Sequence, residues 1–202
     1  MVISQPYLIG LTGNIACGKS TVLQELARLG AAVLDADAVV HQLLKQPGPT
    51  RTAVVKAFGS NILGPDGAID RKILGQIVFQ DPTALSRLES IVHPAVLDFT
   101  WTWLEQVATE VAVIDAIKLI EAGMAERCDE VWVVTCPQEE QIHRLMENRG
   151  LSREEALQRI RAQPPQEEKV ARADVVIDNR GRLEETQTQV LRSWNRLTLK
   201  HT

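Results

Sequence analysis

A chain of 202 residues with 45% hydrophobic and 24% charged residues has the size and composition of one globular domain. Its net charge of −4 excludes the large cationic face of a dedicated nucleic-acid-binding protein, and no apolar run approaches the roughly 18 residues of a membrane span. We expect no signal peptide, because no basic segment precedes a longer apolar one. Three cysteines without metal-type spacing indicate reduced thiols, so we expect a cytoplasmic protein. From the charge and the lack of a long apolar run, we expect neither nucleic-acid nor membrane partners.

Five short apolar runs rich in β-branched residues predict strands. In chain order they are Tyr7–Thr12, Ala32–Asp35, Val111–Asp115, Glu130–Thr135 and residues 174–177. Most are continuously apolar rather than alternating, which is typical of strands covered on both faces. Helical stretches lie between them, so the pattern predicts an α/β domain with a parallel five-stranded sheet flanked by helices.

Helix signals support this alternation. The apolar residues over 19–29 recur on one stripe and predict a helix after the first strand. Asp81 before Pro82 has the order of an N-cap followed by proline at the first helical position. Ser152 and Glu155 form a capping-box pattern that opens another helix.

Two long connections interrupt the regular alternation. Residues 36–110 separate the second and third strands and far exceed one crossover helix. The helices predicted there cover residues 37–45, 50–58, 71–79 and 82–105. We interpret this segment as a helical insertion, the natural place for a second substrate. A shorter, arginine-rich excursion over about 137–172 separates the fourth and fifth strands.

A phosphate loop follows the first strand. Residues 13–20 read GNIACGKS and match G-x-x-x-x-G-K-[ST] at every defined position, between a predicted strand and a predicted helix. Its N–H groups and the helix N-terminus favour phosphate oxygens, while Lys19 would reach the β- and γ-phosphates and Ser20 would bind Mg²⁺. The candidate nucleotide-binding residues are Gly13, Asn14, Ile15, Ala16, Cys17, Gly18, Lys19, Ser20 and Thr21. Cys17 either contributes only its backbone N–H or carries a thiol acidified by the helix.

Three aspartates end or follow predicted strands, where ligands of open α/β sheets bind. Asp115 ends the third strand and suits a magnesium contact opposite Ser20, although it could also simply end the strand in a turn. Asp35 and Asp37 would point the same way if the second strand continued through both. One could then polarise an acceptor hydroxyl while the other addresses the metal. A helix N-cap at one of the two acids is the other interpretation, a role that Asp37 would serve well, and both roles can coexist.

The late excursion concentrates cationic side chains among glutamates. They are Arg144, Arg149, Arg153, Arg159, Arg161, Lys169 and Arg172. Most are expected on solvated helix faces, in ion pairs that contribute little stability. One or two could close over the transferring phosphoryl group and neutralise its charge.

Six segments resemble the dephospho-CoA kinase family over residues 9–190. They are IGLTGNIACGKST at 9–21, LGAAVLDADAVVHQLL at 29–44, GAIDRKILGQIVF at 67–79, LESIVHPAV at 88–96, CDEVWVVTC at 128–136 and LSREEALQRIRAQPPQEEKVARADVVIDN at 151–179. The resemblance implies a P-loop, nucleoside-monophosphate-kinase-like fold with a helical substrate-binding insertion and a lid. It implies that the γ-phosphoryl group of ATP passes to the ribose 3′-hydroxyl of dephospho-CoA, the last step of coenzyme A biosynthesis.

The resemblance also implies domain limits. It suggests one domain over 7–200, with a nucleotide-binding core (7–36, 110–136, 173–200), a CoA-binding insertion (37–109) and a lid (137–172). Within these limits Asp37 matches the catalytic base and Asp35 its metal-side partner. The further candidates are Asp70, Arg71 and His93 for the substrate, Arg149 and Arg144 for phosphates, and Asn179 near the adenine. His93, which precedes a proline, could instead shape a helix bend.

The sequence departs from the family pattern at two places. The usual loop G-G-I-G-S-G-K has small residues where this chain has Asn14, Ala16 and Cys17. Lys118 appears after Asp115 in DAIKLIE, where the family more often reads D-[IV]-P-L-L-[FY]-E. Lys118 could bind a substrate phosphate or merely be exposed.

Three other functions compete with this interpretation. Another P-loop small-molecule kinase would share the loop, but the DAD and HP segments favour the CoA precursor. A GTPase would need an N-K-x-D element, which the sequence lacks. A non-catalytic ATP-binding protein would not need acids such as Asp35 and Asp37 near the γ-phosphate. We expect a monomer or a small homo-oligomer with dephospho-CoA as its small-molecule partner.

Overall fold

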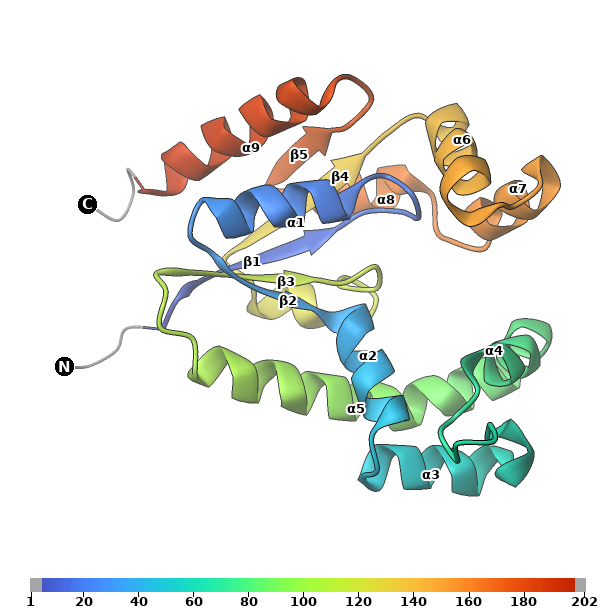
Figure 1. Ribbon diagram of the computed structural model, residues 1–202. Coiled ribbons are helices and arrows are strands. Elements are labelled where there is room, and N and C mark those ends of the chain that lie inside the picture. The colour runs from blue at the N-terminus through green and yellow to red at the C-terminus, as the bar shows by residue number, and fades with distance from the viewer. Residues whose placement is uncertain (1–4, 199–202) are drawn as a thin grey trace. The chain divides into compact units, whose positions relative to one another are not determined.

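The protein contains a parallel five-stranded sheet, as predicted. The computed structural model describes residues 5–198. The strands are β1 (Tyr7–Thr12), β2 (Ala32–Asp35), β3 (Val111–Asp115), β4 (Glu130–Thr135) and β5 (Val175–Asp178), in the order β2-β3-β1-β4-β5 (Figure 1). The predicted domain limit at 200 and the first four residues lie outside the described part of the chain. No helix within residues 5–198 is long and apolar enough to cross a bilayer.

The register of the sheet places the ends of its central strands at one edge. Leu11 of β1 pairs with Asp115, the last residue of β3, and Thr12 pairs with Val133 of β4. Thr135 of β4 pairs in turn with Asp178, the last residue of β5. The segments that follow these strands therefore emerge side by side, where an open α/β sheet binds its ligands.

The chain divides into two compact units. The first contains residues up to Leu34 and from Val107 onward, and the second is Asp35–Gln106. Besides the sheet, the described part of the first unit holds α1 (Lys19–Arg28), η2 (Met124–Arg127), α6 (Gln138–Arg149), α7 (Arg153–Arg161), α8 (Gln166–Val170) and α9 (Leu183–Thr198). The second unit holds α2 (Ala36–Lys45), α3 (Pro49–Phe58), η1 (Ser60–Ile62), α4 (Arg71–Gln80) and α5 (Pro82–Glu105).

The core of the first unit lies between the sheet and the helices α1 and α9. Ile9 of β1 and Trp132 of β4 are fully buried there, together with Val22 and Leu26 on the apolar stripe of α1 and Val190 of α9. The Trp132 indole donates a hydrogen bond of 2.9 Å to the Glu130 carboxylate, so its polar edge is satisfied. This packing gives the β1–α1 connection a rigid base.

In the second unit, helix α5 packs against α2, α3 and α4. The carboxylate of Asp81 accepts a hydrogen bond from the Thr83 N–H and caps α5, and Pro82 occupies the first helical position, as predicted. Asp70 caps α4 in the same way, through the N–H groups of Lys72 and Ile73. The Asp70 carboxylate, a candidate for substrate contact, thus has a structural role.

The second strand ends at Asp35, as predicted, and does not continue through Asp37 of the DAD segment. Helix α2 begins at Ala36, because Asp35 already serves as its N-cap and accepts a 3.0 Å hydrogen bond from the Ala38 N–H. The predicted cap, Asp37, lies instead in the first turn of α2. An acidic side chain there is favourable at the positive end of the helix, and the two carboxylates do not share a strand face. The capping box of Ser152 and Glu155 on α7 is confirmed.

Candidate phosphate-binding site

The loop between β1 and α1 adopts a conformation that requires its glycines. Gly13 has φ 155° and Gly18 has φ 90°. A β-carbon at Gly13 would collide with the Val134 main-chain oxygen, and one at Gly18 would collide with the side chain of Asn179. Ala16, with φ 60°, is the single non-glycine residue with positive φ among residues 5–198. Such a conformation costs about 1 kcal/mol or more and persists where surrounding contacts impose it.

Lys19, at the start of α1, lies beside the end of β3. Its Nζ is 3.9 Å from Asp115 Oδ1, and only 13% and 11% of the two side chains are exposed. The register between β1 and β3 produces this proximity, because Leu11 pairs with Asp115 and the loop returns to Lys19. An ammonium held at the N-terminus of a helix, next to a glycine-rich loop, is suited to bind phosphate oxygens.

The residues near Lys19 also fit a magnesium ion. Ser20 is exposed in the first turn of α1, and Asp115 is buried at the end of β3. The described residues contain no group of three or more histidine, cysteine, aspartate or glutamate side chains that could hold a metal. Mg²⁺ in phosphoryl-transfer sites does not need such a cage, because one or two protein oxygens, substrate phosphates and water complete its coordination.

Two predicted residues, Arg144 and Asn179, brace the loop. The Asn179 amide donates 2.8 Å to the Cys17 carbonyl, while its oxygen accepts from the Thr186 hydroxyl at 2.8 Å. Arg144 of α6 donates to the carbonyls of Ala16 and Asn179 at 3.2 and 2.9 Å. Because the C=O and N–H of a planar peptide point in opposite directions, fixing the Cys17 carbonyl turns the Gly18 N–H the other way. These contacts support the loop conformation from the protein side.

Cys17 lies in a polar, buried setting. Its sulfur accepts a 2.9 Å hydrogen bond from Gln141 of α6, and its side chain is fully buried. The pKa of Cys17 is lowered to about 7, first by a hydrogen bond from the Cys136 thiol and also by Gln141 and the charge of Lys19, against the opposing effect of burial. The same hydrogen bond and burial raise the pKa of Cys136. The causes of the lowered pKa, Cys136 first, differ from the helix N-terminus to which the sequence analysis attributed an acidic Cys17 thiol.

The remaining predicted residues are not joined to this group by the contacts described. Arg149 is exposed at the last position of α6, and Lys118 is exposed in the turn after β3. Asp35, Asp37, Arg71 and His93 belong to the second unit. The first three are exposed near helix N-termini, whereas His93 is half-buried within α5, one residue before a proline inside that helix.

Sequence reasoning missed three polar residues that contact the phosphate loop, which are Gln141, Gln163 and Gln166. Lys169, named among cations expected mostly on solvated helix faces, is instead buried and donates to the Ile117 carbonyl. One signal was available for Gln141: it lies on the buried face of α6 next to Ile142, where an apolar residue is normal. The partners of the other residues are remote in sequence, so their contacts required the fold.

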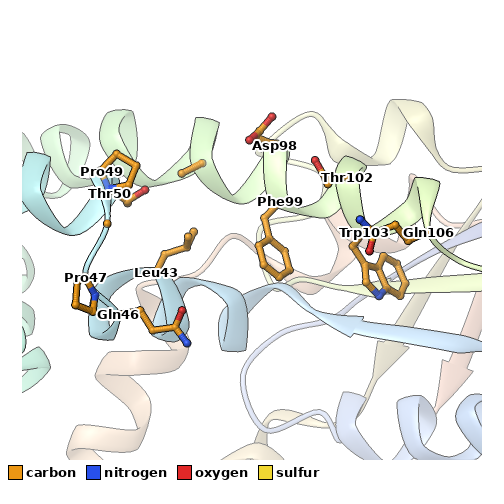
Figure 2. A pocket seen from close by; sticks show the side chains of 12 residues that line it. Leu43, Gln46, Pro47, Pro49, Thr50, Asp98, Phe99, Thr102, Trp103 and Gln106 are labelled. Atoms are coloured by element: carbon orange, nitrogen blue, oxygen red, sulfur yellow. The ribbon is translucent and has the colours of Figure 1, made fainter.

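The second unit contains a pocket of about 500 Å³ between α2, the start of α3 and the C-terminal half of α5. Figure 2 shows Phe99 and Trp103 pointing from α5 toward α2, with Leu43 of α2 pointing back toward α5. Asp98, Thr102 and the side chains of two glutamines also line the pocket. Its size and mixed lining are typical of small-molecule sites.

The sheet order and the braced G-x-x-x-x-G-K-S loop at the end of β1 define a P-loop kinase fold. The family model described as dephospho-CoA kinase matches residues 7–185. A dephospho-CoA kinase of Geobacter sulfurreducens is 50% identical over 190 residues, which cover 93% of this chain and 96% of that protein. The chain therefore belongs to the dephospho-CoA kinase family.

Two solved structures are similar along almost the whole chain. TT1252 from Thermus thermophilus superposes with a TM-score of 0.85 at 36% identity, covering 96% of this chain and 98% of that one. The dephospho-CoA kinase from Campylobacter jejuni has a TM-score of 0.70 at 28% identity, covering 98% and 100% of the two chains. The likeness thus includes the connections between strands as well as the sheet.

Proposed function

We propose that the protein transfers the γ-phosphoryl group of ATP to the ribose 3′-hydroxyl of dephospho-CoA, giving CoA and ADP, as the last step of coenzyme A biosynthesis. The observation that carries the proposal is a complete phosphate loop, with Lys19 beside Asp115, in a chain of this family. The reduced thiols and the net charge of −4 support a cytoplasmic enzyme without a nucleic-acid partner.

On the nucleotide side, the N–H groups of the loop and the Lys19 ammonium bind the β- and γ-phosphates and offset charge in the transition state. Ser20 and Asp115, with Asp35 as a further candidate, would hold Mg²⁺, which would neutralise phosphate charge and orient the γ-phosphoryl group. Arg149 and Arg144 of α6 contribute positive charge to the phosphates, and Asn179 contributes to the adenine side of the site.

On the acceptor side, Asp37 acts as general base. Its carboxylate accepts the proton of the 3′-hydroxyl as the oxygen bonds to the γ-phosphorus and the bond between that phosphorus and the β,γ-bridging oxygen breaks, leaving ADP. Arg71, His93 and Lys118 are the proposed contacts for the acceptor. Arg71 and Lys118 are exposed cations that suit its phosphates.

We assign the pocket of the second unit to the uncharged thiol-bearing arm of the acceptor. Phe99 and Trp103 supply apolar area, while Thr102 and the glutamine side chains can pair with the amides of the arm. Trp103→Ala should raise the KM for dephospho-CoA about 10-fold with the KM for ATP unchanged. An acceptor truncated to its nucleotide portion should be used equally well by both forms, and an equal KM ratio for both acceptors would contradict the assignment.

The proposed function is tested by ADP formation from Mg²⁺-ATP by the purified protein, with dephospho-CoA and with a panel of nucleosides, nucleotides and sugars. We expect dephospho-CoA, and no other acceptor of the panel, to stimulate ADP formation strongly. Stimulation by another acceptor instead would identify a different small-molecule kinase, and ATP binding without stimulation by any acceptor would indicate a non-catalytic nucleotide-binding protein.

A further inference from the structure

Lys169 is a buried lysine that the proposed chemistry does not use. It lies on α8, in the segment that returns from α7 to β5, and is 2% exposed. Its ammonium donates 2.7 Å to the Ile117 carbonyl and 2.8 Å to the Glu121 carboxylate. A lysine is rarely buried this deeply unless its charge is paired, because burial removes its hydration. The two partners of the Lys169 ammonium therefore offset the cost of burying its charge.

Both partners of Lys169 belong to the turn that follows Asp115. The Ile117 carbonyl also accepts a 3.1 Å hydrogen bond from the Thr12 hydroxyl, at the last residue of β1 before the phosphate loop. The two donors fix the backbone two residues after Asp115, whose carboxylate lies beside Lys19. Lys118, the proposed acceptor contact, lies between the two residues that Lys169 binds.

The same returning segment also binds the phosphate loop. Gln163 accepts a 2.7 Å hydrogen bond from the Ile15 N–H, and the Pro164 carbonyl accepts 3.0 Å from the Asn14 amide. Gln166 accepts from the Cys17 thiol at 3.4 Å and from the Cys136 N–H at 3.3 Å. Residues 163–169, which we name the return segment, thus contact the chain that follows β1, β3 and β4. Figure 1 shows α6, α7 and α8 at the same end of the sheet as the loop before α1.

We propose that Lys169 is a positioning residue, through which the return segment holds the turn after β3 in register with the phosphate loop. The inference rests on the proposed kinase function. Lys169 fixes the backbone of the turn that contains Lys118 and directly follows Asp115, and so acts on both residues indirectly. The other contacts of the return segment hold the phosphate loop. Loss of the ammonium should therefore loosen the turn while the nucleotide-binding N–H groups stay in place. The expected deficit is in the rate of phosphoryl transfer rather than in ATP affinity.

The test compares Lys169→Met with Lys56→Met, which removes an exposed lysine from α3. For Lys169→Met we expect kcat to fall about 10- to 100-fold with the KM for ATP within about threefold of wild type. A loss of this size is expected when catalytic groups are shifted out of position. Amide exchange in residues 115–122 should be about 10-fold faster than in wild type, whereas the loop residues 13–18 should be unchanged. Lys56→Met should behave as wild type in both measurements.

A kcat within about twofold of wild type in folded Lys169→Met would overturn the proposal, whatever happens to the melting temperature. If the methionine variant does not fold, Lys169→Gln is judged by the same criteria, because its amide keeps a donor but has a shorter reach. Should the wild-type protein fail to phosphorylate dephospho-CoA, the proposed function fails, and amide exchange still decides the positioning role: unchanged exchange in residues 115–122 would refute it.

Discussion

The two units of the chain present their candidate residues in different ways. In the unit with the sheet, Lys19, Asp115 and Asn179 are largely buried and tied by ion pairs or hydrogen bonds to one another or to the phosphate loop. In the helical unit, Asp37 and Arg71 are exposed in the first turns of helices. The proposed nucleotide-binding residues are thus mostly buried and held by these contacts, whereas the proposed acceptor-binding residues Asp37 and Arg71 lie on an accessible surface.

The largest loss of activity is expected for Lys19, among the proposed nucleotide-binding residues of the first unit. Lys19→Ala should lower kcat/KM for ATP by about 10³-fold, because one cation serves both phosphate binding and the transition state. Steady-state kinetics and ATP titration measure the two contributions. Lys45→Ala, which removes an exposed lysine at the end of α2, is the control for loss of charge. Wild-type ATP affinity and rate in Lys19→Ala would contradict the assigned phosphate site.

A smaller and more selective effect is expected on the acceptor side. Asp37→Asn should lower kcat about 10²-fold, the scale of a lost general base, with ATP affinity unchanged. Asp66→Asn is a matched control at an exposed aspartate of the same unit. If Asp37→Asn is fully active, Asp37 is not the general base. If the variant loses ATP affinity instead, the proposal that the first unit binds ATP and the second binds the acceptor is wrong.

The acidity of Cys17 offers a probe of the loop itself. Because its pKa is lowered to about 7, its thiolate forms at lower pH than that of an ordinary cysteine. The Cys17 side chain is fully buried, so a small reagent reaches it when the loop opens, and alkylation should then rise with pH to a half-maximum near pH 7. Cys136→Ala removes the largest cause of the shift, so this midpoint should move upward. Bound ATP should slow the reaction. Mass spectrometry of the labelled peptide measures both effects, and a wild-type midpoint near 8.5 would exclude the acidified thiol.

The smallest effect concerns stability. Ala16→Gly relieves a positive φ and should stabilise the protein by about 1 kcal/mol, which corresponds to about 2–4 °C in melting temperature. Thermal unfolding measures the change, with Ala57→Gly within helix α3 as a control that should lose stability. A decrease in melting temperature for Ala16→Gly would mean that the contacts of this loop, and not its backbone strain, dominate.

These comparisons also explain what the sequence could predict. The phosphate loop was predictable because its residues are contiguous and its strand and helix flank it directly. The sheet followed from apolar runs, and the caps at Asp81 and Ser152 from local patterns. Local patterns placed the end of the second strand at Asp35 but favoured Asp37 as the helix cap, because which acid caps the helix depends on where the backbone turns.

The contacts that brace the loop were beyond local reasoning. The hydrogen bond between Ile15 and Gln163 joins residues 148 positions apart, and that between Cys17 and Asn179 joins residues 162 positions apart. Glutamines and lysines are ordinary surface residues in a sequence, and only the fold shows that Gln141 and Lys169 are buried. Sequence patterns therefore predict the chemical groups of such a site better than the residues that position them.

The measurement that tests the central claim most directly is identification of the product formed from Mg²⁺-ATP and dephospho-CoA, with Lys19→Ala as the blank. Mass spectrometry should show the gain of one phosphoryl group on the acceptor in step with ADP formation, and NMR should place the phosphate on the ribose 3′-oxygen. An unmodified acceptor, or a phosphate at any other position, would contradict the proposed reaction.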